Sequence, residues 1–548
     1  MPWTRPRIIP APGPTTAQPR PDPGPVAVRH CPLDHGSVKP PRGPARGPRL
    51  LRGGFRPGGN HVSDHARRAA AYTPLPVLEP AAHHLVSRFS YGVTPALTKT
   101  VRAKGHLAWF EGQLRPAKVQ DRPGDALAGW WPDLSRTPLE LWTRQVKGVR
   151  GGWEVMRDYG SWLLARRHTS NRQVLEVMTE FWENHLHVPV TSDGHFTWRA
   201  RYGALVRQHA LGRFDRMLVA AVTHPAMLLH LDGARSTAEA PNENLGRELL
   251  ELFTVGRGRY TEADVKDSAR ILTGWHVDTN DTWQALYVPE HHSTGPVRVG
   301  TFRDPNRSRD GRAMTRRYLT HLARHPDTAA HLARKLAVAF VSDDPPAALV
   351  RKLARVYLQH DTAIVPVLRA LVRSPAFRAA AGAKLRDPSA DVVATYRALG
   401  VRLQKPASSS SATAAMLSST GSLGLTTGTW PRPDGAPITN AAWSTPLRVL
   451  ASVDLHWSMA HRSWPTKELV HRAPAAYLPP LPVTLRQLVD HASRIVLGKP
   501  APAYLVEACA LATGFPATEV VTAEHAIVKH HLSRVLATLL DSPDHYAR

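Results

Sequence analysis

Three carboxylates, one guanidinium and one amide are expected to share one helix face in residues 241–256 (PNENLGRELLELFTVG). Helical residues advance by about 100° each, so side chains three and four positions apart lie on the same side. Glu248 and Glu251 can therefore converge on one ligand, and carboxylates so placed can hold a divalent metal or serve as an acid–base pair. Arg247 can bind an anionic group through two parallel hydrogen bonds. The whole face comprises Glu243, Asn244, Arg247, Glu248 and Glu251.

Two short amphipathic helices joined by a glycine turn are expected to present these groups. Asn242 is a good N-cap residue, and Gly256 and Gly258 end the first helix. Thr261 and Asp264 have the spacing of a capping box, with Asp in place of the usual Glu, so a second helix begins there. A solvated face with i,i+4 ion pairs, each worth about 0.3–0.5 kcal/mol, is the structural alternative to a site. The candidate binding residues of this stretch are Asn242, Glu243, Asn244, Arg247, Asp264, Asp267, Trp275 and His276.

Two histidines outside this stretch could join its carboxylates. Residues 170–188 (SNRQVLEVMTEFWENHLHV) predict an amphipathic helix, in which His185 lies at the edge of the apolar face beside Asn184, a further candidate binding residue. On spacing alone, a hydrogen-bonded core histidine is favoured over a ligand. His291 lies in a loop, where binding residues often occur. The candidate catalytic residues are therefore His185, Glu248, Glu251 and His291.

The positive charge of the chain does not indicate a nucleic-acid partner. The net charge is +26, but 57 of the 70 basic residues are arginine, a bias that a GC-rich bacterial genome produces without functional cause. The basic residues are scattered, and no basic stripe alternates with aromatic residues as in nucleic-acid-binding surfaces. We therefore expect no nucleic-acid partner.

Cysteine content and hydropathy exclude other classes. The two cysteines, Cys31 and Cys509, exclude a disulfide framework and a cysteine-based zinc site. No apolar run is long enough to cross a bilayer, so no membrane span is expected. The chain begins without the apolar core of a signal peptide, which predicts a cytoplasmic protein.

The first 61 residues are expected to be a disordered tail. They contain 15 of the 49 prolines, and ten basic but only two acidic residues, so they offer little apolar surface to bury. The run Gly58–Val62 could be encoded by a ribosome-binding sequence followed by a GTG start codon. We therefore expect the true start near Val62, which N-terminal sequencing of the native protein can test.

The remaining chain predicts an all-α protein, a bundle-like array of helices. Helical periodicity dominates, and the best strand candidates, residues 283–303, predict at most a short β-hairpin or ordered loop. We expect a helical core domain at 75–405 and a C-terminal helical region at 406–548 packed on it. Within the latter, residues 428–443 (GTWPRPDGAPITNAAW) form a turn-rich loop with aromatic residues that could contact a carbohydrate or a protein.

Eight sequence blocks, taken together, resemble a large bacterial family known as domain of unknown function 1800, over about residues 75–548. They occur in the family's order, which makes the resemblance specific. The blocks are HHLVSRFSYGVTPA (83–96), FWENHLHV (181–188), HPAMLLHLDG (224–233), NENLGRELLELFTVG (242–256), YTEADVKDSARILTGW (260–275), HHSTGPVRVG (291–300), ARKLAVAFVSDDPP (333–346) and LLDSPDHYAR (539–548).

The resemblance implies a shared polar site but names no reaction. The family commonly has a histidine where this chain has Glu183, and His-Asp where this chain has His291-His292. A metal role that needs both positions is therefore doubtful here. Relatives often carry export signals, so export is not excluded, and they are often encoded beside a sulfatase-like protein, which is the partner that the resemblance implies.

Two functions compete on these grounds. The first is a non-catalytic scaffold or partner-binding protein with a charge-paired internal site, and it ranks slightly ahead because no known catalytic spacing is present. The alternative is a metal- or carboxylate-dependent hydrolase that uses the Glu243–Glu251 face with nearby histidines, with a divalent metal as its cofactor.

Overall fold

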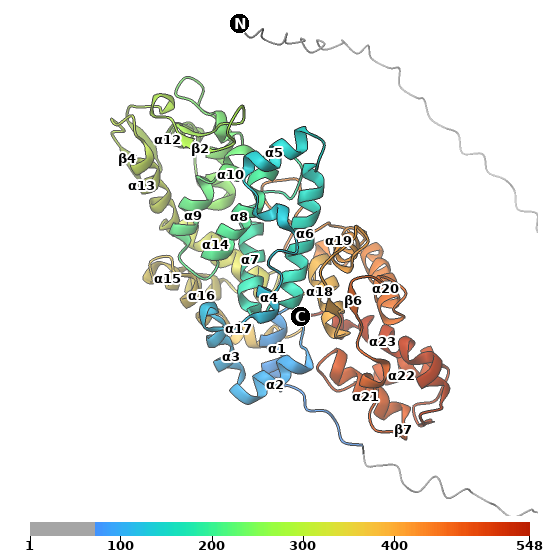
Figure 1. Cartoon of the computed structure of the whole chain (residues 1–548). Helices are drawn as coiled ribbons and strands as arrows, with labels where there is room; N and C mark the ends of the chain where they lie inside the picture. The colour runs from blue at the N-terminus through green and yellow to red at the C-terminus, as the bar shows by residue number, and fades with distance from the viewer. Residues whose placement is uncertain (1–71) are drawn as a thin grey trace, which may run out of the picture. The chain divides into compact units, whose positions relative to one another are not determined.

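Helix α7 (Gln173–His185) lies at the centre of the fold, as the computed structural model shows (Figure 1). Its apolar face is buried, in agreement with the amphipathic helix expected at 170–188. The structure describes residues 72–548. The expected tail at 1–61 and the expected start at Val62 lie outside the described residues.

Helices precede and surround α7 over the first part of the described chain. Proline at the first turn and a side-chain cap begin several of them, as at Thr94 and Thr137. These helices are α1 (Pro80–Arg88), α2 (Pro95–Lys104), α3 (His106–Gln113), α4 (Arg122–Asp125), α5 (Pro138–Val146), α6 (Gly152–Thr169), α8 (Phe196–His209), α9 (Phe214–Val222) and α10 (Pro225–His230).

The stretch 241–275 folds as the two capped helices that its sequence predicts, with one difference. Helix α11 (Glu243–Glu248) starts at the N-cap Asn242, and α12 (Glu262–Ile271) starts with the capping box. Between them the first helix widens into a π-helical turn, η5 (Leu249–Phe253), in which Thr254 Oγ1 donates to the Leu249 carbonyl at 2.6 Å.

The later chain is also helical. Its helices are α13 (Arg312–Ala323), α14 (Pro326–Phe340), α15 (Ala347–Gln359), α16 (Ile364–Val372), α17 (Pro375–Ala379), α18 (Pro388–Ala398), α19 (Ala412–Ser422), α20 (Pro446–Ala460), α21 (Leu485–Val496), α22 (Ala503–Thr513), α23 (Leu532–Leu540) and α24 (Pro543–Tyr546). No helix among residues 72–548 combines the length and apolar character needed to cross a bilayer.

Strands are short and occur as antiparallel pairs. Two pairs lie around the expected hairpin region: β1 (Trp275–Val277) with β2 (Ala285–Tyr287), and β3 (Val297–Val299) with β4 (Phe302–Asp304). Two further pairs have strands of only two residues: β5 (Arg402–Leu403) with β6 (Leu469–Val470), and β7 (Val483–Thr484) with β8 (Val520–Val521). Strands this short have no alternating apolar pattern from which they could be predicted. The prediction of a mainly helical protein is confirmed.

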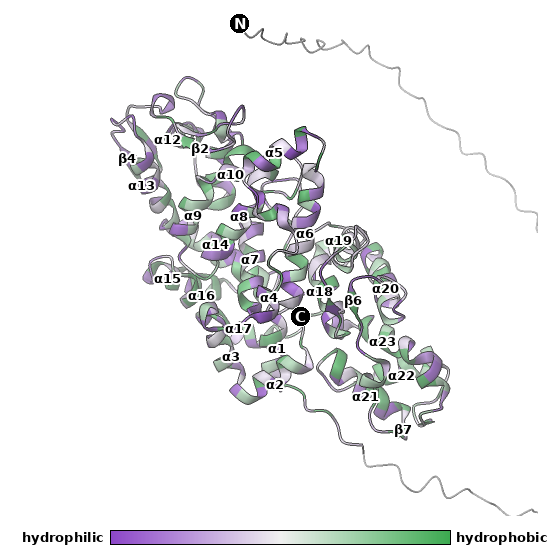
Figure 2. Cartoon of the chain, viewed as in Figure 1, coloured by the Kyte–Doolittle hydropathy of each residue, from purple (hydrophilic) through white to green (hydrophobic). Residues whose placement is uncertain are grey.

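One large apolar cluster runs through the described residues, from Leu78 to Leu540. The helices around it have green apolar and purple polar positions along their length (Figure 2). Helix α19 packs against α6 and α18, so residues on both sides of position 405 share packing contacts. The expected division into 75–405 and 406–548 stays a prediction.

Candidate functional site

One polar face of α7 lines a cavity of about 140 Å³, which we call the charged cavity. Glu180, Glu183 and Asn184 line it from one side of the helix, and His187, two residues beyond the end of α7, lines it as well. Helices α6, α8, α14 and α18, the loop 428–443, and residues outside these elements supply the rest of the lining; the residues outside are Lys384, Leu385, Asp387, Leu425, Thr427 and Arg548. The aromatic side chains of the lining are Phe181, Phe340, Trp430 and Trp443.

Two pairs of opposite charge form the floor of the charged cavity. Arg167 contacts Glu180 with 2.7 Å between Nη1 and Oε1, and the Tyr91 hydroxyl donates to the other Glu180 oxygen at 2.6 Å. Burial and then the neighbouring Asp387 raise the pKa of Glu180, against the opposing effect of Arg167. Both Glu180 oxygens are therefore engaged within the protein.

The second pair is buried more deeply. Arg199 Nη1 lies 3.0 Å from Glu183 Oε1, which also accepts a 2.8 Å hydrogen bond from the Tyr159 hydroxyl. Arg199 Nε donates to the Val188 carbonyl at 2.8 Å. Glu183 is therefore a partner in an ion pair rather than a vacant ligand position.

The loop 428–443, which we call the cavity loop, is fastened to the end of α7 through main-chain atoms. The Asn184 side chain donates to the Ala436 carbonyl at 2.9 Å and accepts from the Ala436 amide at 2.7 Å. His187 Nε2 donates to the Trp430 carbonyl at 2.8 Å, because a carbonyl can only accept. Burial lowers the pKa of His187 to about 4, so the ring that makes this bond is neutral at pH 7.

A glycine lets the cavity loop approach this closely. Gly435 has φ +76°, a conformation that L side chains rarely adopt, and a Cβ there would lie 2.0 Å from the Asn184 carbonyl oxygen. The far end of the loop is fixed as well. Asn440 bonds to the backbone of Ala383 and Leu385, and Lys384 donates to the Ile438 carbonyl at 2.8 Å.

A family model described as protein of unknown function (DUF1800) matches residues 84–547. The chain belongs to this family. No curated protein and no solved structure matches the chain. Within the matched residues, Asn184 and His185 contact mainly backbone groups.

His185 is buried and closes the π-helical turn η5. Its Nε2 donates to the Phe253 carbonyl at 3.1 Å, which leaves Nδ1 to accept from the Lys335 ammonium at 3.0 Å. The next carbonyl, that of Thr254, accepts from His331 at 2.8 Å. Burial and then Lys335 hold the pKa of His185 well below its usual value. His185 and His331 thus each satisfy one carbonyl at the end of the widened turn.

The Glu243–Glu251 face meets the start of α12 rather than the histidines. Arg247 forms an ion pair with Glu262 at 2.7 Å and a longer one with Glu243 at 3.5 Å. Glu251 binds Arg257 at 2.6 Å and accepts from the Tyr260 hydroxyl. Glu262 is 69% exposed, so this pair resembles the solvated alternative more than an internal site.

Glu248 differs from its neighbours. It is half-buried, and it forms no ion pair with any described residue. Burial, then Glu251 and Asp434, raise its pKa. The structure does not bring His185, Glu248, Glu251 and His291 into one metal-sized group, since the one such group among residues 72–548 lies elsewhere.

The remaining predicted residues mostly contact backbone or neighbouring side chains. Asp264 and Asp267 accept from the amides of Gly300 and Arg298, which fixes the β3–β4 hairpin on α12. The other contacts are these: Asn242 accepts from the Asn244 amide, Trp275 donates to Thr315, His276 bonds to the Ala234 carbonyl, and the rings of His276 and His291 lie 6.0 Å apart.

Most residues of the charged cavity were not predicted from the sequence. A signal existed on α7, where Glu180 and Glu183 share a face with Asn184. The partners carried no local signal, because they come from distant parts of the chain. These are Arg167, Arg199, Lys384, Asp387 and Arg548.

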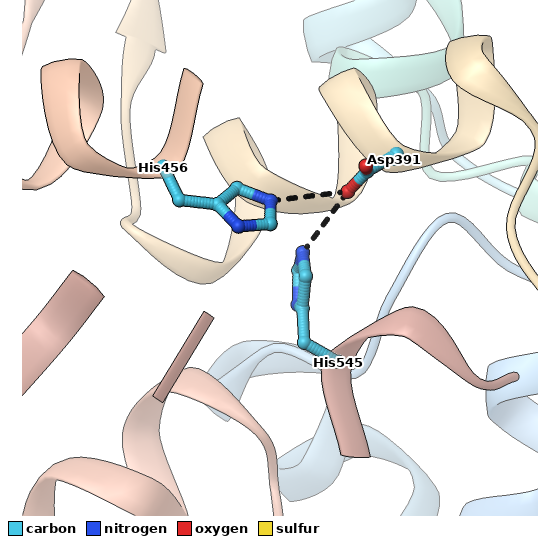
Figure 3. A group of neighbouring side chains, drawn as sticks. All are labelled: Asp391, His456 and His545. Carbon is cyan, nitrogen blue, oxygen red and sulfur yellow. Dashed lines mark hydrogen bonds and ion pairs between the residues drawn. The ribbon is translucent and has the colours of Figure 1, made fainter. Parts of the chain in front are cut away.

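A second buried cluster joins α18, α20 and α24 (Figure 3). Asp391 Oδ1 lies 3.2 Å from His456 Nε2 and 3.4 Å from His545 Nε2. The other Asp391 oxygen accepts from Ser452 at 2.7 Å and pairs with Arg448 at 3.0 Å. Ligand atoms of the aspartate and the two histidines all lie within 4.8 Å of one another, so a metal ion has to be considered.

The charges around this cluster favour a proton over a metal ion. His456 faces carboxylates through both ring nitrogens, since Nδ1 lies 2.8 Å from Asp541. Burial alone lowers the pKa of His456, but Asp391 and Asp541 raise it to about 9. The imidazolium and Arg448 then neutralise the two aspartates, whereas a divalent cation replacing the proton leaves one buried positive charge in excess. The cluster therefore ties three helices together as a charge-balanced network.

Proposed function

We propose that this protein is a non-catalytic binding protein that holds a small ligand in the charged cavity. The observation that carries the proposal is that the residues around the cavity are fixed. Two charge pairs line it, and hydrogen bonds hold the cavity loop at both ends. A volume of about 140 Å³ is close to that of a cavity that holds one benzene molecule, roughly 150 Å³.

The engagement of the acidic groups supports binding rather than catalysis. Arg167 and Tyr91 engage the two oxygens of Glu180, and Arg199 and Tyr159 both engage Oε1 of Glu183. A general acid or base needs a position within hydrogen-bond reach of its substrate. Charge pairs of this kind instead hold the walls in register around a ligand.

The hydrolase alternative at the Glu243–Glu251 face stays a hypothesis with a simple test. Metal analysis of the purified protein, with Glu248→Ala as the comparison, separates the two functions. Stoichiometric zinc, manganese or iron that is lost in Glu248→Ala favours the hydrolase. The expected sulfatase-like partner and cytoplasmic location also stay predictions.

A ligand screen with a cavity-filled variant tests the binding function. Ala339 is buried and lines the charged cavity, so Ala339→Leu places three additional carbon atoms in the space and leaves the charge pairs intact. At 100 times its Kd a ligand stabilises the fold by about 2.7 kcal/mol, or about 3 °C for about 480 ordered residues.

Thermal scans of wild type and Ala339→Leu against a library of small metabolites give the readout. We expect compounds that raise the melting temperature of the wild type and leave that of the variant unchanged. A library in which every compound shifts the two proteins equally contradicts the proposal.

A further inference from the structure

Two oppositely charged side chains of the charged cavity lack a charged partner among the described residues. Arg548 has no acceptor for its guanidinium, and its Nε is buried without a hydrogen bond. Asp387 forms no ion pair; it accepts only the Ala390 amide, at 2.9 Å, as the N-cap of α18. Every other acidic or basic lining residue named above is paired, through Arg167–Glu180, Glu183–Arg199 or Lys384–Asp343.

The main chain of Arg548 and the side chain of Asp387 are held in place. The Arg548 amide donates to the Lys384 carbonyl at 2.8 Å, and the Arg548 carbonyl accepts from the fully buried Arg88 at 2.7 Å. Asp387 is fixed by its capping bond. Both act on the same carboxyl group, since Arg548 lowers and Asp387 raises the pKa of Glu180. Both line the charged cavity, yet they do not neutralise each other by direct contact.

On the basis of the proposed binding function, we propose that the ligand is a small zwitterion of the amino-acid class. Its carboxylate binds Arg548 and its ammonium group binds Asp387. A ligand with only an anionic group leaves Asp387 without a countercharge inside the protein. A ligand with only a cationic group leaves Arg548 without one. Unpaired charges removed from water are costly, so a ligand that carries both charges is favoured over either.

The rest of the cavity suits an apolar side group on this zwitterion. Phe181, Phe340 and Trp430 line the same space, and together with Trp443 they provide aromatic walls. The cavity volume of about 140 Å³ restricts the ligand to roughly the size of a single amino acid. The cavity loop carries both tryptophans, so their fluorescence reports on occupancy.

Matched sets of three compounds test the charge requirement on the full-length protein. Alanine, leucine and phenylalanine are each compared with the amine that lacks the carboxylate and the acid that lacks the amine, by calorimetry and tryptophan fluorescence. We expect at least one amino acid to bind ten-fold or more tightly than both of its singly charged analogues. If every amino acid tested has a singly charged analogue that binds as tightly as the amino acid itself, the inference is wrong.

Two variants assign the ends of the zwitterion. Asn is as good an N-cap as Asp, so Asp387→Asn keeps the start of α18 while it removes the charge. We expect Asp387→Asn to weaken amino-acid binding ten-fold and to leave binding of the acid analogue unaffected. We expect Arg548→Gln to weaken amino-acid binding as well and to leave binding of the amine analogue unaffected. Equal losses for all compounds in either variant contradict the assignment.

The failure of this inference is distinguishable from that of the binding function. If the metabolite screen finds a ligand that Ala339→Leu excludes, but no amino acid binds, the cavity binds ligands and the zwitterion inference is wrong. If neither the screen nor the matched sets give a compound that Ala339→Leu excludes, both are wrong.

Discussion

Replacement of His456 by glutamine removes the proton that we place between Asp391 and Asp541, and the effect depends on pH. The pKa of His456 is raised from its ordinary value of 6.5 to about 9 in the folded protein. The folded state therefore binds this proton more tightly than the unfolded state. The resulting stabilisation is fully present below pH 6.5 and is lost as the pH rises through 9.

The expected size follows from the shift. A difference of about 2.5 pKa units at about 1.4 kcal/mol each gives about 3.5 kcal/mol. For about 480 ordered residues the entropy of unfolding is about 1 kcal/mol/K, so the effect equals about 3.5 °C in melting temperature. The melting temperature of the wild type should exceed that of His456→Gln, and this difference should therefore shrink by about 3 °C between pH 6 and pH 9.5.

Thermal scans at matched heating rates over this pH range provide the measurement. His360→Gln, which changes an exposed histidine, serves as the control and should show no such trend. A wild-type advantage that is constant from pH 6 to pH 9.5, or that grows with pH, refutes the protonated network. In that case a metal ion at Asp391, His456 and His545 becomes the better explanation of their proximity.

Three further predictions concern the cavity and the core. Gly435→Ala should release the cavity loop to proteinase K, while Gly514→Ala, which has nearly the same φ (+78°) but open space around its Cβ, should not. Arg199→Met leaves the Glu183 carboxylate buried without its partner and should lower the free energy of unfolding by about 3–5 kcal/mol. Replacing both residues by methionine should lower it by less, which a double-mutant cycle would measure. Burial raises the pKa of Cys509 to about 12, so iodoacetamide should label this thiol only after unfolding, and labelling at native rates before unfolding would contradict its burial.

The helices could be predicted because their signals are local. Apolar spacing and capping residues lie within a few positions of one another, as in the capping box of Thr261 and Asp264. The structural alternative for His185, a hydrogen-bonded core histidine, also followed from its position at the edge of an apolar row, and its contacts agree with that alternative. Local periodicity does not, however, identify which element a polar face meets.

The charged cavity could not be predicted for this reason. Glu180 and Arg167 lie 13 positions apart, but Asp387 and Arg548 reach the same space from more than 200 and 360 positions further along the chain. The Glu243–Glu251 face illustrates the converse. Its density of charge attracted a functional interpretation, yet its partners, Glu262 and Tyr260, lie in the adjacent turn and helix.

The fastening of the cavity loop through main-chain atoms has a consequence for how the site can change. Asn184 and His187 bind the backbone of Ala436 and Trp430, and every residue type except proline offers the same amide and carbonyl. Of the contacts described, only those of Gly435 and the Asn440 side chain demand a particular residue in the loop. The side chains that face the ligand can therefore be exchanged while the closure of the loop is retained, so related proteins, or designed variants, can acquire new ligands on an unchanged frame.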